Sequence, residues 1–124
     1  VQKPQHVRWN ELQSTDLPRA LQFYAKHFGF GLRETMPMGD AGEYHFIDQG
    51  EVRLGGMMKT PAPHLRGGWR FYFGVPSVAA AKRAIEAGGG KITVQPNQVP
   101  GGDWTLIATD PQGATFGVVG LMGD

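Results

Sequence analysis

The chain begins with an alternating pattern that predicts a β-strand over residues 6–13. In a strand, every second side chain points to the same face of the sheet. One face is therefore expected to carry Val7, Trp9, Glu11 and Gln13, and the other Arg8, Asn10, Leu12 and Ser14. The pattern thus places Trp9 and Glu11 on one surface.

A helix is predicted directly after this strand. Asp16 is part of a Ser-Thr-Asp sequence typical of a helix N-cap, and Gly29 is a typical C-terminal stop. Between them, apolar residues recur at helical spacing and predict a buried stripe of Leu17, Leu21, Tyr24 and Phe28. Three further strands are expected at residues 30–35, 43–48 and 51–57, and a linker rich in proline at residues 59–67.

The second half of the chain begins the same pattern again. A strand is predicted at residues 69–75, and a helix at 78–87 with Ser77 as its N-cap. Val78, Ala81 and Ile85 are expected to face the core. Three glycines end the helix, and strands are predicted at residues 91–95, 103–109 and 114–119.

The two halves keep a nearly constant spacing, which indicates a duplicated unit. The N-caps Asp16 and Ser77 are 61 positions apart, and so are the helix stops Gly29 and Gly90. The sequence therefore predicts an α+β fold in a single domain over residues 1–124. It contains two tandem βαβββ modules, at residues 6–58 and 68–120.

Composition narrows the range of functions. The formal net charge of the 124 residues is +1 and no basic stripe is present, which argues against nucleic acid as a partner. The absence of cysteine excludes disulfides, thiolate catalysis and cysteine-ligated zinc. No apolar run approaches the roughly 20 residues of a membrane span, so we expect a cytoplasmic protein with no membrane partner.

Several motifs in order resemble one known family. They are residues 16–24, the Phe28-Gly29-Phe30 stop, the strand at 69–75, residues 87–91, and the closing run 110–116. Together they resemble the vicinal oxygen chelate superfamily, which includes glyoxalase I, bleomycin-resistance proteins and extradiol dioxygenases. The resemblance implies that the two modules form an incomplete barrel around a cavity.

In metal-dependent members of that family, the first and fourth strands of each module supply His, Gln or Glu ligands. Carried over to this chain, those positions fall on Trp9, on Arg70, at about Gly55, and on Gly117. None of these residue types is a metal ligand. The chain is therefore similar to a glyoxalase-like subgroup that starts with Trp-x-Glu-Leu, here residues 9–12. We expect no metal cofactor, and a divalent metal held by displaced residues such as Glu11 and His45 stays open.

Two charged residues are the main candidates for chemistry. Glu11 is a candidate general base or ligand-orienting group, and Arg70 is a candidate anchor for a carboxylate or phosphate. The alternative is that the two form a structural ion pair with each other. The remaining candidates for ligand binding are Trp9, Tyr72, Trp104 and His45, for which core packing is the competing interpretation.

Two functions follow as hypotheses. The first is a metal-independent protein that binds a small molecule in the barrel cavity, as antibiotic-sequestering members of the superfamily do. The second is an enzyme of lyase, isomerase or dioxygenase-like type that uses Glu11 as base and Arg70 as anion anchor. A weaker third is a protein-interaction module. The family resemblance and the exposed strand edges favour a homodimer.

Overall fold

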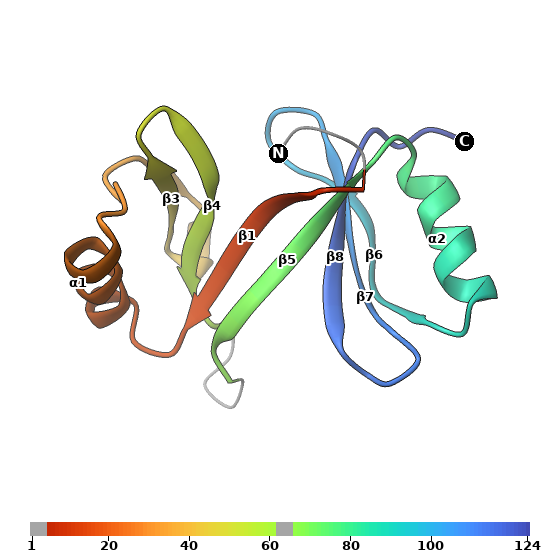
Figure 1. Cartoon of the computed structure of the whole chain (residues 1–124), viewed down its shortest axis with the longest axis horizontal. Coiled ribbons are helices and arrows are strands. Elements are labelled where there is room, and N and C mark those ends of the chain that lie inside the picture. The colour runs from red at the N-terminus through yellow and green to blue at the C-terminus, as the bar shows by residue number, and fades with distance from the viewer. Residues whose placement is uncertain (1–4, 62–65) are drawn as a thin grey trace. The chain divides into compact units, whose positions relative to one another are not determined.

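The computed structural model describes residues 5–61 and 66–124 (Figure 1). Within these residues the elements follow the order β1-α1-β2-β3-β4 and then β5-α2-β6-β7-β8. This is βαβββ twice, so the predicted α+β fold with two modules is confirmed. Residues 62–65 of the predicted linker, including Pro63 and His64, lie outside the described residues.

The first module contains a four-stranded sheet and one helix. Its elements are β1 (Val7–Ser14), α1 (Leu17–Phe28), β2 (Thr35–Pro37), β3 (Glu43–Gln49) and β4 (Val52–Lys59), with a short 3-10 turn at Gly39–Ala41. The strands lie in the order β2-β3-β4-β1. β1 and β4 are parallel, whereas the other neighbours are antiparallel.

The helix α1 has the predicted ends and covers one face of this sheet. The Asp16 side chain accepts a hydrogen bond from the Arg19 amide at 3.2 Å, and Gly29 ends the helix in the left-handed conformation with φ 70°. Leu17, Leu21 and Tyr24 pack, as predicted, against a core made by Leu12, Ile47 and Met57.

Two predictions for this module are wrong. Phe28 was placed in the buried stripe, but it is 57% exposed because it ends the helix and stacks at the surface on Tyr24 and Phe30. The strand predicted at residues 30–35 is reduced to one bridge between Gly31 and Asp48, and β2 begins only at Thr35. Phe30 and Leu32 instead pack against the core of Leu12, Ile47 and Met57, and this packing does not require strand hydrogen bonds.

The second module repeats this arrangement. Its elements are β5 (Gly68–Val75), α2 (Val78–Ala87), β6 (Lys91–Gln98), β7 (Trp104–Thr109) and β8 (Thr115–Gly120), with strand order β5-β8-β7-β6. Ser77 caps α2 by accepting from the Ala80 amide at 3.0 Å. Val78, Ala81 and Ile85 pack on the core of Leu106, Ala108 and Val118, as predicted.

The described residues divide into two compact units, residues 10–61 with 66–69, and residues 5–9 with 70–124. Residues 5–9 thus belong with the second module: the Gly74 amide donates to the His6 carbonyl at 2.8 Å, and Arg8 pairs with Asp103 at 2.7 Å. In the described parts of the chain, neither helix is long and apolar enough to cross a membrane.

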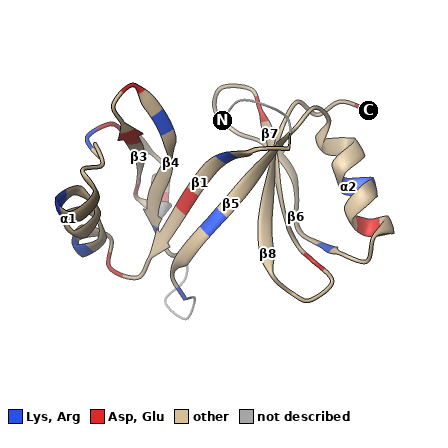
Figure 2. Cartoon of the chain, viewed as in Figure 1, with Lys and Arg blue, Asp and Glu red and all other residues tan. Residues whose placement is uncertain are grey.

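Charged residues are spread over the helices and strands of each module (Figure 2), and one cluster links β3 to β4. Arg53 donates to both carboxylate oxygens of Asp48, at 2.8 and 3.1 Å, and to Glu34 at 2.8 Å. The hydrogen bond from Arg53 lowers the pKa of Asp48, and the same contacts raise the pKa of Arg53. The cluster therefore stabilises the hairpin while Asp48 is ionised.

We predict that Asp48→Asn lowers the free energy of unfolding at pH 7, with a loss that shrinks in acid. Because the folded-state pKa of Asp48 is lowered, its contribution is complete above the unfolded carboxyl pKa of about 3.9 and is lost as the pH falls through the folded value. Urea unfolding of both proteins at pH 7, 5 and 3 measures this difference. Glu34→Gln serves as the exposed control, with a smaller effect. A difference that stays constant from pH 7 to 3 would contradict the prediction.

Candidate functional site

The register of the first module's sheet assigns its side chains to two faces. Leu12, Met57 and His45 are paired across β1, β4 and β3, and this row faces α1. The adjacent row of Glu11, Gly56 and Phe46 faces the opposite way. We call this second surface the helix-free face. The predicted alternation of β1, with Glu11 and Leu12 on opposite faces, is therefore confirmed.

Glu11 is a buried carboxylate on the helix-free face. It is 9% exposed, and the hydroxyl of Tyr44, itself 7% exposed, donates to its Oε1 atom at 3.0 Å. The Gln13 amide lies 3.5 Å from Oε2. A carboxylate that accepts hydrogen bonds while shielded from water is held in one orientation, as both ligand binding and proton transfer require.

The ring of Tyr44 reaches Glu11 because Gly56 leaves room for it. A Cβ atom on Gly56 would lie 1.9 Å from the Tyr44 ring, far inside van der Waals contact. Phe46 packs edge-on against the same ring at 5.6 Å, and the Arg53 guanidinium lies 4.2 Å from the centre of the Phe46 ring. Tyr44 is thus fixed by its packing as well as by its hydrogen bond.

Our sequence reasoning missed Tyr44 as a site residue. Its partner Glu11 is 33 positions away, on a strand that is not its neighbour in the sheet. The usable signal was the strand at residues 43–48, which alternates so that Tyr44 and Phe46 share a face, opposite a strand that contains two glycines.

The second module shows a matching pair. Tyr72 is 7% exposed and lies directly opposite Gly117 in the parallel β5–β8 ladder. A Cβ atom on Gly117 would lie 2.3 Å from the Tyr72 ring. Arg70 precedes Tyr72 by two positions on β5, so it belongs to the same helix-free face of the second module.

The structure corrects one position carried over from the family. Gly55 is paired with Asn10 and Ile47 and therefore lies on the face that α1 covers, not with Glu11. Its missing Cβ allows close approach of the strands, since a Cβ would lie 1.7 Å from the Asn10 carbonyl oxygen. The fourth-strand residue that corresponds to Gly117 is Gly56, at the same offset of 61 as the helix N-caps Asp16 and Ser77.

The residues at these positions do not fit a bound metal ion. At both fourth-strand positions, Gly56 and Gly117, a tyrosine ring occupies the space that a ligating side chain would need. Glu11 and His45 lie on opposite faces of one sheet, so they do not converge on one ion. Among the described residues, no three His, Asp or Glu side chains lie close enough to hold a metal.

The other predicted site residues are dispersed. Trp104 packs on the core beneath α2, on the opposite face of its sheet from Tyr72. His45 makes a hydrogen bond with the Leu32 carbonyl at 3.2 Å and lies 3.9 Å from Glu43. Trp9 is half-buried and precedes Glu11 by two positions on β1. The pairing of Glu11 with Arg70 stays a prediction.

Comparison with known proteins supports the fold and the family resemblance. The model of the Glyoxalase/Bleomycin resistance protein/Dioxygenase superfamily matches residues 3–118. The protein CFP32 of Mycobacterium bovis and Mycobacterium tuberculosis, provisionally named a glyoxylase, is 31% identical over 111 residues. That match covers 90% of this chain and 42% of CFP32, so the chain spans less than half the length of these relatives.

Solved structures share the fold at low identity. BH1468 from Bacillus halodurans C-125 superposes with a TM-score of 0.72 at 13% identity, covering 93% of each chain. Methylmalonyl-CoA epimerase from Mycobacterium tuberculosis superposes with a TM-score of 0.67 at 14% identity, covering 90% of this chain and 85% of the epimerase. At these identities the likeness concerns the fold.

We predict that Gly56→Ala displaces the Tyr44 ring and lowers the free energy of unfolding by about 1–3 kcal/mol, the usual cost of overpacking. Gly31→Ala is the matched control, because its Cβ would meet only ordinary contacts from 3.5 Å outward. Its expected change is within about 0.5 kcal/mol. Urea unfolding measures both variants, and equal stability of the two would show that the Tyr44 packing is not tight.

Proposed function

The chain belongs to the Glyoxalase/Bleomycin resistance protein/Dioxygenase superfamily, and on that basis we propose that it is a metal-independent binding protein for a small molecule. The observation that carries this proposal is the tyrosine ring over glycine in each module, Tyr44 over Gly56 and Tyr72 over Gly117. In each pair an aromatic ring lies where a metal-ligating side chain would otherwise be. Such surfaces suit an organic ligand better than a metal ion.

We propose that the ligand contacts the helix-free face of the first module. Glu11 and Tyr44 supply the oriented polar groups in the first module, and Phe46 adds an aromatic wall beside them. In the second module, Arg70 and Tyr72 occupy the equivalent face. A few oriented polar groups among aromatic side chains are typical of sites that recognise partly aromatic small molecules.

A second candidate is an enzyme, favoured by the burial and orientation of Glu11. In this alternative the Glu11 carboxylate takes a proton from the substrate, the Tyr44 hydroxyl keeps the carboxylate in position, and Arg70 binds an anionic part of the substrate. The relatives named as a glyoxylase and as methylmalonyl-CoA epimerase make this alternative concrete, because methylmalonyl-CoA is a defined compound to test.

Native mass spectrometry of untagged protein tests the first proposal. We expect a homodimer without stoichiometric metal, with or without a co-purified organic molecule. The measurement reports the mass of the assembly, the metal and the adduct together. One tightly bound divalent metal per chain would overturn the metal-independent proposal, and a monomer would overturn the homodimer.

Proton exchange on methylmalonyl-CoA separates binding from catalysis. In heavy water, followed by proton NMR, the binding proposal predicts no protein-dependent loss of the C2 proton signal. If the signal is lost at a rate that Glu11→Gln reduces at least about 100-fold, the enzyme alternative is correct, since general base catalysis is worth about that much or more. Tyr44→Phe keeps the carboxylate and should reduce such a rate less. Circular dichroism shows whether each variant is folded.

A further inference from the structure

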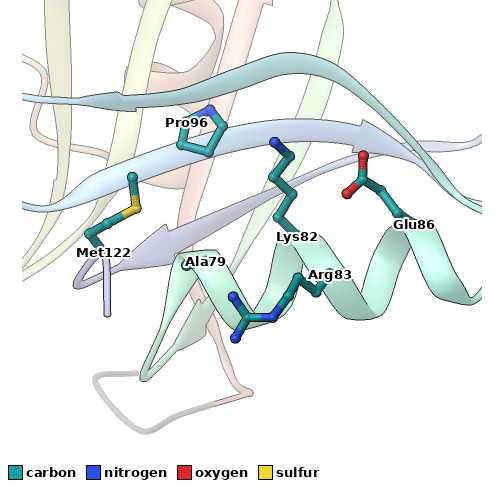
Figure 3. Close-up of a pocket in the computed structure, with 6 residues that line it drawn as sticks. All are labelled: Ala79, Lys82, Arg83, Glu86, Pro96 and Met122. Carbon is teal, nitrogen blue, oxygen red and sulfur yellow. The ribbon is translucent and has the colours of Figure 1, made fainter. Parts of the chain in front are cut away.

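The second module has a hollow on its other side, away from Tyr72. It has a volume of about 400 Å³ and lies between α2, β6 and the segment after β8 (Figure 3). Its lining consists of Ala79, Lys82, Arg83 and Glu86 from the helix, Pro96 from the strand, and Met122. Because α2 covers the face opposite Tyr72, this hollow is separate from the helix-free face. Its volume is in the range of small-molecule sites, roughly 300–1,000 Å³.

The two cations that line this hollow differ in their hydrogen bonding. The Arg83 guanidinium donates to the carbonyl oxygen of Asp124. Lys82 is half-buried and extends from α2 toward the strand that carries Pro96 (Figure 3). Within the described residues, its ammonium group has no ion pair or hydrogen bond, and it does not pair with Glu86 one turn along the helix. Lys82 is therefore the cation available to a ligand.

The rest of the lining defines the ligand more closely. Ala79, Pro96 and Met122 form apolar walls, and methionine adapts its shape to varied apolar groups. The two cations and one carboxylate give the lining an excess of one positive charge. Glu86 disfavours a doubly charged anion, since its own charge would repel the second negative charge.

We propose that this hollow is a binding site for small aliphatic monocarboxylates. The carboxylate of the ligand pairs with Lys82, and its hydrocarbon chain lies against Met122 and Pro96. This site is additional to the ligand site proposed on the helix-free face and does not depend on it.

The test is a titration of the folded, isotope-labelled chain with hexanoate, followed by amide NMR. We expect saturable shifts at Ala79, Lys82 and Met122, with Glu11 and Tyr44 unaffected. Lys82→Gln should weaken binding about tenfold or more, because it removes a charge-assisted hydrogen bond. Glu86→Gln should strengthen binding about two- to fivefold, because it removes a nearby like charge. Glutamine is a good helix former, so both variants should keep α2 intact.

Two controls make the result decisive. Lys91→Gln removes the same charge from an exposed position on β6 outside the hollow, and it should leave hexanoate binding unchanged. Hexan-1-ol has the same chain length without the charge and should bind more weakly. The proposal is wrong if hexanoate causes no saturable shifts in the hollow, if Lys82→Gln and Lys91→Gln weaken binding equally, or if hexan-1-ol binds as well as hexanoate. Hexanoate shifts confined to Glu11 and Tyr44 would also overturn it, while leaving the function proposed above intact.

Discussion

The candidate site depends on one steric relation, the tyrosine ring that lies over a glycine on the neighbouring strand. A Cβ on Gly56 would lie within 1.9 Å of the Tyr44 ring, so the ring can lie over β4 only because that side chain is absent. From this position the Tyr44 hydroxyl crosses the width of β4 and reaches Glu11 on β1. The glycine therefore determines where the tyrosine lies, and the tyrosine determines how the carboxylate is oriented.

The same steric relation occurs in both modules, and in each it leaves no room for a metal-ligating side chain on the fourth strand. In this chain, a ligating side chain at Gly56 or Gly117 would need the volume that Tyr44 or Tyr72 already fills. Restoring a metal ligand would thus require two coordinated changes in each module, a new donor and a smaller ring neighbour. The glycines do not disturb the strand pairing. Gly56 stays paired with Glu11, and Gly117 stays paired with Tyr72.

The sequence predicted the features that neighbouring residues determine. It predicted less well the features that depend on pairing between strands far apart in the chain. Caps such as Asp16 and Ser77, and the stripe from Val78 to Ile85, follow from neighbouring residues, and all were predicted. The choice between Gly55 and Gly56 is a shift of one residue, yet it exchanges the faces of the sheet. It is decided by pairing with β1, 45 positions away, and by an irregularity of the β3–β4 ladder at Ile47 and Asp48. Tyr44 was missed for the same reason, since its role exists only across three strands.

The burial of Glu11 is informative in itself. A buried carboxylate is costly unless hydrogen bonds satisfy it, and a purely structural position is served equally well by an apolar residue. Tyr44 has a single hydroxyl proton and donates it to Glu11, so from any further partner its oxygen can only accept a hydrogen bond. A Glu11→Gln substitution would remove the negative charge of Glu11 while nearly keeping its shape. A role that survives such a neutral replacement is structural or steric, whereas a role that requires the charge involves a ligand or a proton.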